Sequence, residues 1–180
     1  MFNKAVYNII NIARNRKTLN IVNKVARIDN SNMIIPNLYL GNISSANDID
    51  FLQQNNIQAI INCTINEPFN DYFEDKNTFR LAINDSRDTD NISTFKSEII
   101  SCIEFIESNL DDNKAVYVHC YWGLMRSATV IAGYLIKKYN ITHEDAIQII
   151  KEQRPMAILP VYNFNEVLKY VELTYKKNDS

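Results

Sequence analysis

A cysteine and an arginine stand six positions apart in the segment HCYWGLMRSAT, residues 119–129. Gly123 lies between them, and Ser127 follows the arginine directly. The apolar residues 115–118 before this segment favour a strand, and residues 128–135 after it favour a helix. A strand, a tight loop and a helix N-terminus in this order form a cradle of backbone N–H groups that binds anions. The segment therefore predicts attack of a cysteine on a bound phosphate.

Cys120 and Arg126 are expected to perform the central chemistry. A free thiol has a pKa of about 8.5, and a helix N-terminus with an adjacent arginine lowers that value by several units, which would make Cys120 a thiolate nucleophile. The guanidinium of Arg126 suits two phosphate oxygens. Ser127 is expected to donate a hydrogen bond to the sulfur. His119 is expected to orient the loop through its ring N–H rather than to act as a base.

The residues between the cysteine and the arginine are expected to bind phosphate mainly through their backbone. Gly123 permits a sharply turned backbone at this point. The phosphate-binding residues predicted here are Tyr121, Trp122, Gly123, Leu124, Met125 and Arg126. The opposite interpretation, a buried thiol and an unrelated surface arginine, requires five specified residue types to coincide by chance, which makes the motif a specific one.

Phosphoryl transfer to cysteine also needs an acid for the leaving oxygen and a base for the incoming water. The only other histidine, His143, is predicted to begin a helix. Residues 83–90 (INDSRDTD) lie between a predicted strand and a predicted helix and contain three aspartates. Asp85 comes directly after the strand and is the predicted acid and base. Asp88 and Asp90 are expected to be solvated loop charges or helix caps.

Composition limits the class of protein. The chain has 180 residues, of which 46% are hydrophobic and 22% charged, as is ordinary for one globular domain. A net charge of −2 gives no case for nucleic-acid binding, and no apolar stretch approaches the ~20 residues needed to span a membrane. Three cysteines indicate free thiols and a reducing, cytoplasmic location.

Apolar patterning predicts an α/β sandwich, with a central, mostly parallel sheet flanked by helices. Strands are expected within 32–41 around Pro36, at 59–63, at 78–83 and at 115–119. Helices are expected from a cap at Ser44 or Ser45 to about Asn55, after a cap at Ser93, at 127–138, at 143–153 after Thr142, and at 161–176. Residues 31–176 are predicted to form the catalytic domain.

Residues 1–30 differ from the rest, because apolar residues recur at helical spacing among six basic residues and one acid. This basic amphipathic extension has three interpretations: packing on its own domain, formation of a homodimer, or contact with a membrane surface or an import system.

The chain resembles dual-specificity protein phosphatases of the cysteine-dependent tyrosine phosphatase superfamily over residues 33–172. The stretches that carry the resemblance are Leu38-Tyr39-Leu40-Gly41 with Ala46, residues 60–64, Asn84-Asp85, Val118-His119-Cys120 with Gly123, Arg126 and Ser127, and Ala146 with Ile149 before Arg154-Pro155. The resemblance implies hydrolysis of phosphotyrosine and phosphoserine/threonine on proteins, without a metal or other cofactor, and implies that Asp85 is the general acid. A viral member is one source that fits, and its location would be the host cytoplasm or the virion.

Three features depart from the family pattern. Met125 stands where a small serine is common in the family. A Pro-Asn pair usually follows the Arg-Pro, and here the corresponding pair is Pro160-Val161, one residue later. The loop 109–114 is slightly extended. None of them removes a predicted catalytic group.

Two other functions remain open. The same mechanism could act on an RNA 5′-triphosphate or a phosphoinositide, since a fold and a motif do not fix a substrate. A phosphate-binding module without activity would normally have lost the cysteine, the arginine or the aspartate. Cys63 is expected to be a core thiol, with a disulfide to Cys120 as the alternative if the two lie within reach.

Overall fold

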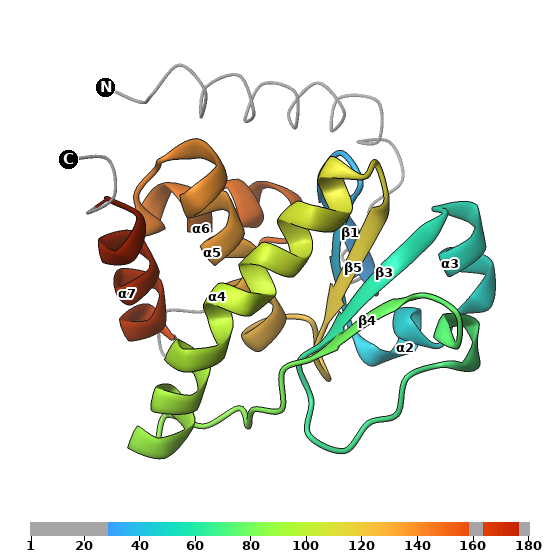
Figure 1. Ribbon diagram of the computed structural model, residues 1–180, viewed down its shortest axis with the longest axis horizontal. Helices are drawn as coiled ribbons and strands as arrows, with labels where there is room; N and C mark the ends of the chain where they lie inside the picture. Colours follow the sequence, from blue (N-terminus) through green and yellow to red (C-terminus); the bar gives the residue numbers. More distant parts are fainter. Residues whose placement is uncertain (1–28, 159–163, 177–180) are drawn as a thin grey trace.

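The computed structural model describes residues 29–158 and 164–176. A five-stranded sheet lies between two layers of helices (Figure 1). The strand order is β1-β2-β5-β3-β4, in which β2, β5, β3 and β4 run parallel and β1 is antiparallel to β2. The strands are β1 (Ser31–Ile35), β2 (Leu38–Gly41), β3 (Ile57–Asn62), β4 (Asn77–Arg80) and β5 (Ala115–His119). The predicted α/β sandwich with a mostly parallel sheet is confirmed.

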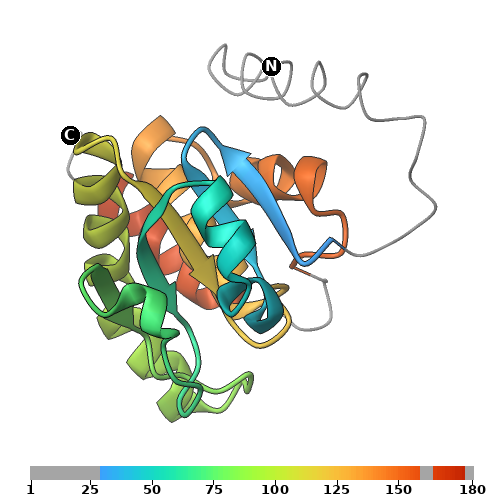
Figure 2. The same cartoon turned by 90° about the vertical axis from the view of Figure 1, so that its right-hand side faces the viewer.

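The helices divide unequally between the two faces of the sheet. One face is covered by α4 (Thr89–Asp111), α5 (Arg126–Tyr139), α6 (His143–Gln153) and α7 (Asn165–Lys176). Figure 2 shows the shorter α2 (Ile43–Ala46) and α3 (Ile49–Gln54) on the opposite face. The short 3-10 helix η2 (Asp71–Phe73) packs on that face as well. No helix within 29–158 or 164–176 is long and apolar enough to cross a membrane.

The central strand β5 is buried along its whole length. Its side chains alternate: Val116 and Val118 pack into the larger core with α4–α7, whereas Ala115 and Tyr117 pack into the smaller core with α2 and α3. Burial on both faces explains why this strand appears in the sequence as a continuous apolar run. The Tyr117 hydroxyl donates a hydrogen bond to the Asn42 carbonyl (2.8 Å). The carboxyl end of β5 is therefore held from both sides of the sheet.

The single helix predicted from Ser44 or Ser45 to about Asn55 is wrong, because two short helices occupy this region. Asn42 caps the first, its side chain accepting a hydrogen bond from the Ser45 N–H (3.1 Å). Asp48 caps the second by accepting from the Phe51 N–H (3.1 Å). A side chain that caps a new helix at Asp48 competes with continuation of the first one.

The long helix α4 also begins earlier than predicted. Asp88, not Ser93, is its cap and accepts from the Asn91 N–H (2.9 Å). At its other end α4 continues to Asp111, so residues 109–111, which were expected in the loop before β5, are helical, and only the turn 112–114 joins α4 to β5. Asn113 makes this turn in the left-handed region, at φ 59°. The extension 1–30 and Pro160-Val161 lie outside the described residues, apart from Asp29 and Asn30.

Candidate active site

The loop that joins β5 to α5 curls over the carboxyl end of the sheet, and two glycines determine how closely it approaches. Gly123 adopts φ +67°, and a Cβ there would lie 2.3 Å from the carbonyl carbon and oxygen of Gly41 at the end of β2. A Cβ on Gly41 would in turn lie 2.2 Å from the Tyr117 hydroxyl oxygen. Both positions therefore exclude any larger side chain. This contact places residues 120–126, called the phosphate loop below, against the end of β2.

Cys120 lies fully buried at the start of the phosphate loop. Its Sγ accepts hydrogen bonds from the Gly123 N–H (3.2 Å) and the Ser127 hydroxyl (3.3 Å). Burial opposes ionisation, but the Ser127 hydroxyl, the Arg126 charge and the N–H groups of Ser127 and Leu124 together outweigh it and lower the pKa of Cys120. The sulfur thus has the surroundings of a thiolate nucleophile.

The other two cysteines have the opposite surroundings. Burial is the main cause that raises the pKa of Cys63 well above its usual value, and it raises the pKa of Cys102 to about 12. Both are free thiols in the larger core, as is Cys120 in this structure. Among the three, only Cys120 has surroundings that lower the pKa of its thiol.

Arg126 begins α5, and it is buried rather than exposed to solvent. Its Nη1 donates to the carbonyl of Cys63 (3.1 Å), just after β3, and to the carbonyl of Ile83 (3.2 Å), after β4. Its Nε lies 3.8 Å from Oδ2 of Asp85. The guanidinium therefore connects the phosphate loop with the loop that carries the acid.

Asp85 is placed at the site, whereas the other two aspartates of its loop are not. Asp85 is half-exposed and faces Arg126. Asp88 accepts from the Ser86 hydroxyl and the Asn91 N–H, which lower the pKa of its carboxyl, the Ser86 bond most. Asp90 is exposed in the first turn of α4. Of the three aspartates in this loop, only Asp85 faces Arg126, whereas Asp88 caps α4 and Asp90 lies exposed in its first turn.

Asn91 holds the acid loop in place, a function that sequence reasoning missed. Its side-chain amide accepts from the Asn84 N–H (2.8 Å) and donates to the carbonyls of Asn84 (2.9 Å) and Ser86 (2.8 Å). These three bonds bracket Asp85 on both sides. In the sequence Asn91 is one of many asparagines, and only the folded loop distinguishes it from them.

His119 is buried with its ring stacked on Tyr117 (centroids 5.8 Å apart, planes at 9°). Burial lowers its pKa to about 4, so the imidazole is neutral at pH 7. Its Nδ1 has no hydrogen-bond partner among the described residues. The orienting function expected for its ring N–H stays a prediction.

The remaining phosphate-loop side chains turn away from the cradle or lie in the core. Trp122 is 64% exposed, and Tyr121 packs edge-on against it, with centroids 5.1 Å apart. Met125, which replaces a small serine of the family pattern, is buried in the larger core beside the half-buried Leu124. Met125 therefore fills core space, and its carbonyl accepts from the Thr129 hydroxyl (2.9 Å).

Arg154, just after α6, is the second residue whose function sequence reasoning missed. It is 2% exposed, and its guanidinium donates to the carbonyls of Gly123 (2.7 Å) and Trp122 (3.2 Å) in the phosphate loop. It also donates to the Asp29 carbonyl and the Asn32 side chain. The Arg154 guanidinium thus links Trp122 and Gly123, called the outer half of the phosphate loop below, to the start of β1. The motif His119–Ser127 contains no signal of this distant partner.

Replacing Arg154 with alanine is expected to weaken phosphate binding and to lower kcat, because the carbonyls of Trp122 and Gly123 lose their anchor. Charged hydrogen bonds contribute roughly 1.5–3 kcal/mol each, so we expect a loss of about 3 kcal/mol or more in the free energy of unfolding. Urea denaturation and phosphate inhibition constants measure the two effects. Arg80→Ala is the matched control, since Arg80 anchors the carbonyls of Thr64, Ile65 and Glu67 instead. Equal phosphate affinity in the two variants would contradict the assignment.

Comparison with known proteins identifies the family of this chain. Residues 38–173 match the family model described as the catalytic domain of dual specificity phosphatases. The chain belongs to the dual-specificity phosphatase family. It is 32% identical over 142 residues to human dual specificity protein phosphatase 16, covering 76% of this chain and 20% of that protein. It is 37% identical over 134 residues to human dual specificity protein phosphatase 6, covering 73% and 33%.

This dual-specificity phosphatase chain thus spans a fifth to a third of the length of those curated relatives. A solved mouse putative dual specificity phosphatase, crystallised with zinc tungstate, has the same fold, with a TM-score of 0.73. It is 21% identical in sequence, and the match covers 88% of this chain and 95% of that one.

Proposed function

We propose that the chain is a protein phosphatase that hydrolyses phosphotyrosine and phosphoserine/threonine through a cysteinyl-phosphate intermediate. One observation carries the proposal: a buried thiol of lowered pKa accepts two hydrogen bonds in a loop whose arginine lies 3.8 Å from an aspartate. Nucleophile, anion cradle and proton donor are the three parts that such a reaction needs. Family membership supports the substrate class.

In the first step, the Cys120 thiolate attacks phosphorus as the bond between phosphorus and the substrate oxygen breaks. Protonated Asp85 donates its proton to that departing oxygen. Arg126 and the N–H groups of residues 121–126 bind the remaining phosphate oxygens as their charge develops. The products of this step are the dephosphorylated side chain and a phosphate bonded to sulfur.

In the second step, the Asp85 carboxylate removes a proton from water, whose oxygen attacks phosphorus. The bond between phosphorus and sulfur breaks, and inorganic phosphate leaves. The electron pair returns to Cys120, where the Ser127 hydroxyl, 3.3 Å from Sγ, stabilises the thiolate as it leaves. Asp85 donates a proton in the first step and recovers one from water in the second, so the two steps balance without a metal.

A direct test compares four substrates with the full chain: a phosphotyrosine peptide, a phosphothreonine peptide, an RNA with a 5′-triphosphate, and vesicles that contain a phosphoinositide. We expect kcat/KM for the phosphopeptides to exceed the values for the RNA and the lipid by about tenfold or more, or at least 1.4 kcal/mol of transition-state stabilisation. A metal chelator is expected to leave the rates unchanged. Phosphate release from the RNA or the lipid alone would reject a protein substrate.

We also propose the organisation of the whole chain. Residues 31–176 would form the catalytic domain and residues 1–30 a basic extension, and one proposed function of that extension is homodimer formation through the amphipathic helix expected from its sequence. Free thiols at all three cysteines support a reducing, cytoplasmic location. The phosphoprotein partners would be substrates that contact the mouth of the phosphate loop.

A further inference from the structure

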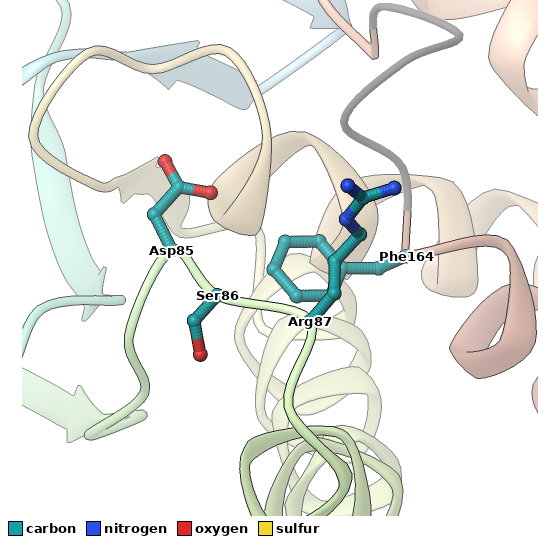
Figure 3. A pocket seen from close by; sticks show the side chains of 4 residues that line it. All are labelled: Asp85, Ser86, Arg87 and Phe164. Atoms are coloured by element: carbon teal, nitrogen blue, oxygen red, sulfur yellow. The ribbon is translucent and has the colours of Figure 1, made fainter.

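A pocket of about 220 Å³ lies beside the predicted acid. Its lining residues are Asp85, Ser86, Arg87 and Phe164 (Figure 3). The Asp85 carboxylate and the Arg87 guanidinium project to the same side of the loop, whereas the Ser86 hydroxyl points to the other side. A cation therefore stands next to the place where the substrate's leaving oxygen must lie.

Arg87 differs from every other arginine within the described residues. Arg80, Arg126 and Arg154 each donate to backbone carbonyls of neighbouring loops. Arg87 is exposed and makes no hydrogen bond or ion pair with any described residue. The nearby carboxylates already have partners, since Asp85 faces Arg126 and Asp88 accepts from Ser86 and Asn91. The guanidinium is therefore available to a ligand.

Hydrogen bonds and side-chain packing fix the surroundings of Arg87. The hydrogen bonds of Asn91 hold Asn84 and Ser86, which fixes the backbone just before Arg87. The floor of the pocket is Phe164, which is only 2% exposed and packs edge-on against Phe95, with centroids 5.1 Å apart. A ligand would thus meet an aromatic floor, with a fork of five donors beside it.

We propose that Arg87 and Phe164 form a second subsite, which binds an anionic side chain of the substrate close in sequence to the phosphorylated residue. Two residues of chain extend at most ~7 Å, so Arg87 lies within that reach of Asp85. An extended peptide covers ~3.3 Å per residue, so the anion would stand one to three positions from the residue being dephosphorylated. A phosphate or a carboxylate fits, and a phosphate is preferred because the planar guanidinium binds it in a bidentate manner.

The test measures kcat/KM on phosphotyrosine peptides that carry glutamine, glutamate or phosphoserine two positions before or two positions after the phosphotyrosine. Ultraviolet absorbance of the released tyrosine reports dephosphorylation of that residue alone. We expect the wild type to favour glutamate over glutamine by about 3-fold and phosphoserine by about 10-fold, at one of the two positions. In Arg87→Gln both ratios are expected to fall to about 1, and in Arg87→Glu to fall below it.

Lys138→Gln is the matched control, because it removes one exposed positive charge at the far end of α5 from the phosphate loop. It is expected to keep the wild-type ratios. The same ratios in Arg87→Gln and the wild type, or no preference in the wild type, would overturn the inference. The inference rests on the proposed function: a wild type that hydrolyses no phosphopeptide would reject that function and the subsite together, whereas turnover without preference rejects the subsite alone.

Discussion

Cys120→Ser is expected to lose essentially all turnover while it still binds phosphate. Serine cannot replace the sulfur, because a hydroxyl remains protonated where the thiol of lowered pKa is ionised. We expect kcat to fall by roughly 10⁴-fold or more, the scale of losing a covalent nucleophile. The backbone cradle and Arg126 remain, so phosphate or a phosphopeptide should bind with near wild-type affinity. Steady-state kinetics and calorimetric titration measure the two quantities.

Cys63→Ser and Cys102→Ser are the controls for this result, and both should keep turnover wherever the protein folds. Alkylation by iodoacetamide adds a pH test. A lowered pKa means that Cys120 reacts as a thiolate at pH values where the thiols of Cys63 and Cys102, whose pKa values burial raises, stay protonated. Phosphate should protect Cys120 from the reagent. Wild-type turnover in Cys120→Ser would remove the cysteine from the mechanism.

Asp85→Asn is expected to lower kcat by about 10²–10⁴-fold, with little change in phosphopeptide binding, since it removes only the group that transfers protons. The loss should depend on the leaving group. Phosphotyrosine needs its oxygen protonated, whereas para-nitrophenolate leaves readily without a proton, so the variant should be impaired more on phosphotyrosine.

Asp88→Asn and Asp90→Asn are matched controls from the same loop. Asparagine caps a helix as well as aspartate does, so Asp88→Asn keeps the start of α4. Both variants should retain kcat within a few-fold of the wild type. If either of them shows the dependence on the leaving group and Asp85→Asn does not, the assignment of the acid is wrong.

Local patterns in the sequence predicted those parts of the fold that depend on neighbouring residues. The bounds of β5 and α6 are as expected, and Thr142 caps α6 by accepting from the Asp145 N–H. The split between α2 and α3 was missed, because capping by Asn42 and Asp48 is decided by rotamers rather than by apolar spacing.

The residues of the candidate site likewise fall into those that are close in sequence, which could be predicted, and those that are distant, which could not. Cys120, Gly123, Arg126 and Ser127 are close in sequence, so one motif contains them all. Arg154 contacts the phosphate loop from 31 residues away in the chain, and an interaction of that range leaves no periodic signature. The contacts of Asn91, and the lack of any partner for Arg87 among the described residues, likewise depend on how the acid loop folds. The motif therefore predicts the chemistry of the site. The residues that hold the phosphate loop, and those proposed to select a substrate, are brought to the site only by the tertiary structure.

The contact between Gly41 and Gly123 has a consequence for the growing chain. The phosphate loop takes its shape only against the end of β2, and its outer half is fixed only when Arg154 is in place. A nascent chain that has emerged from the ribosome as far as α5 carries the complete catalytic motif but lacks the guanidinium that closes the cradle. The proposed site would therefore be complete only after α6 and Arg154 have been synthesised, so the motif alone would not make a nascent chain active.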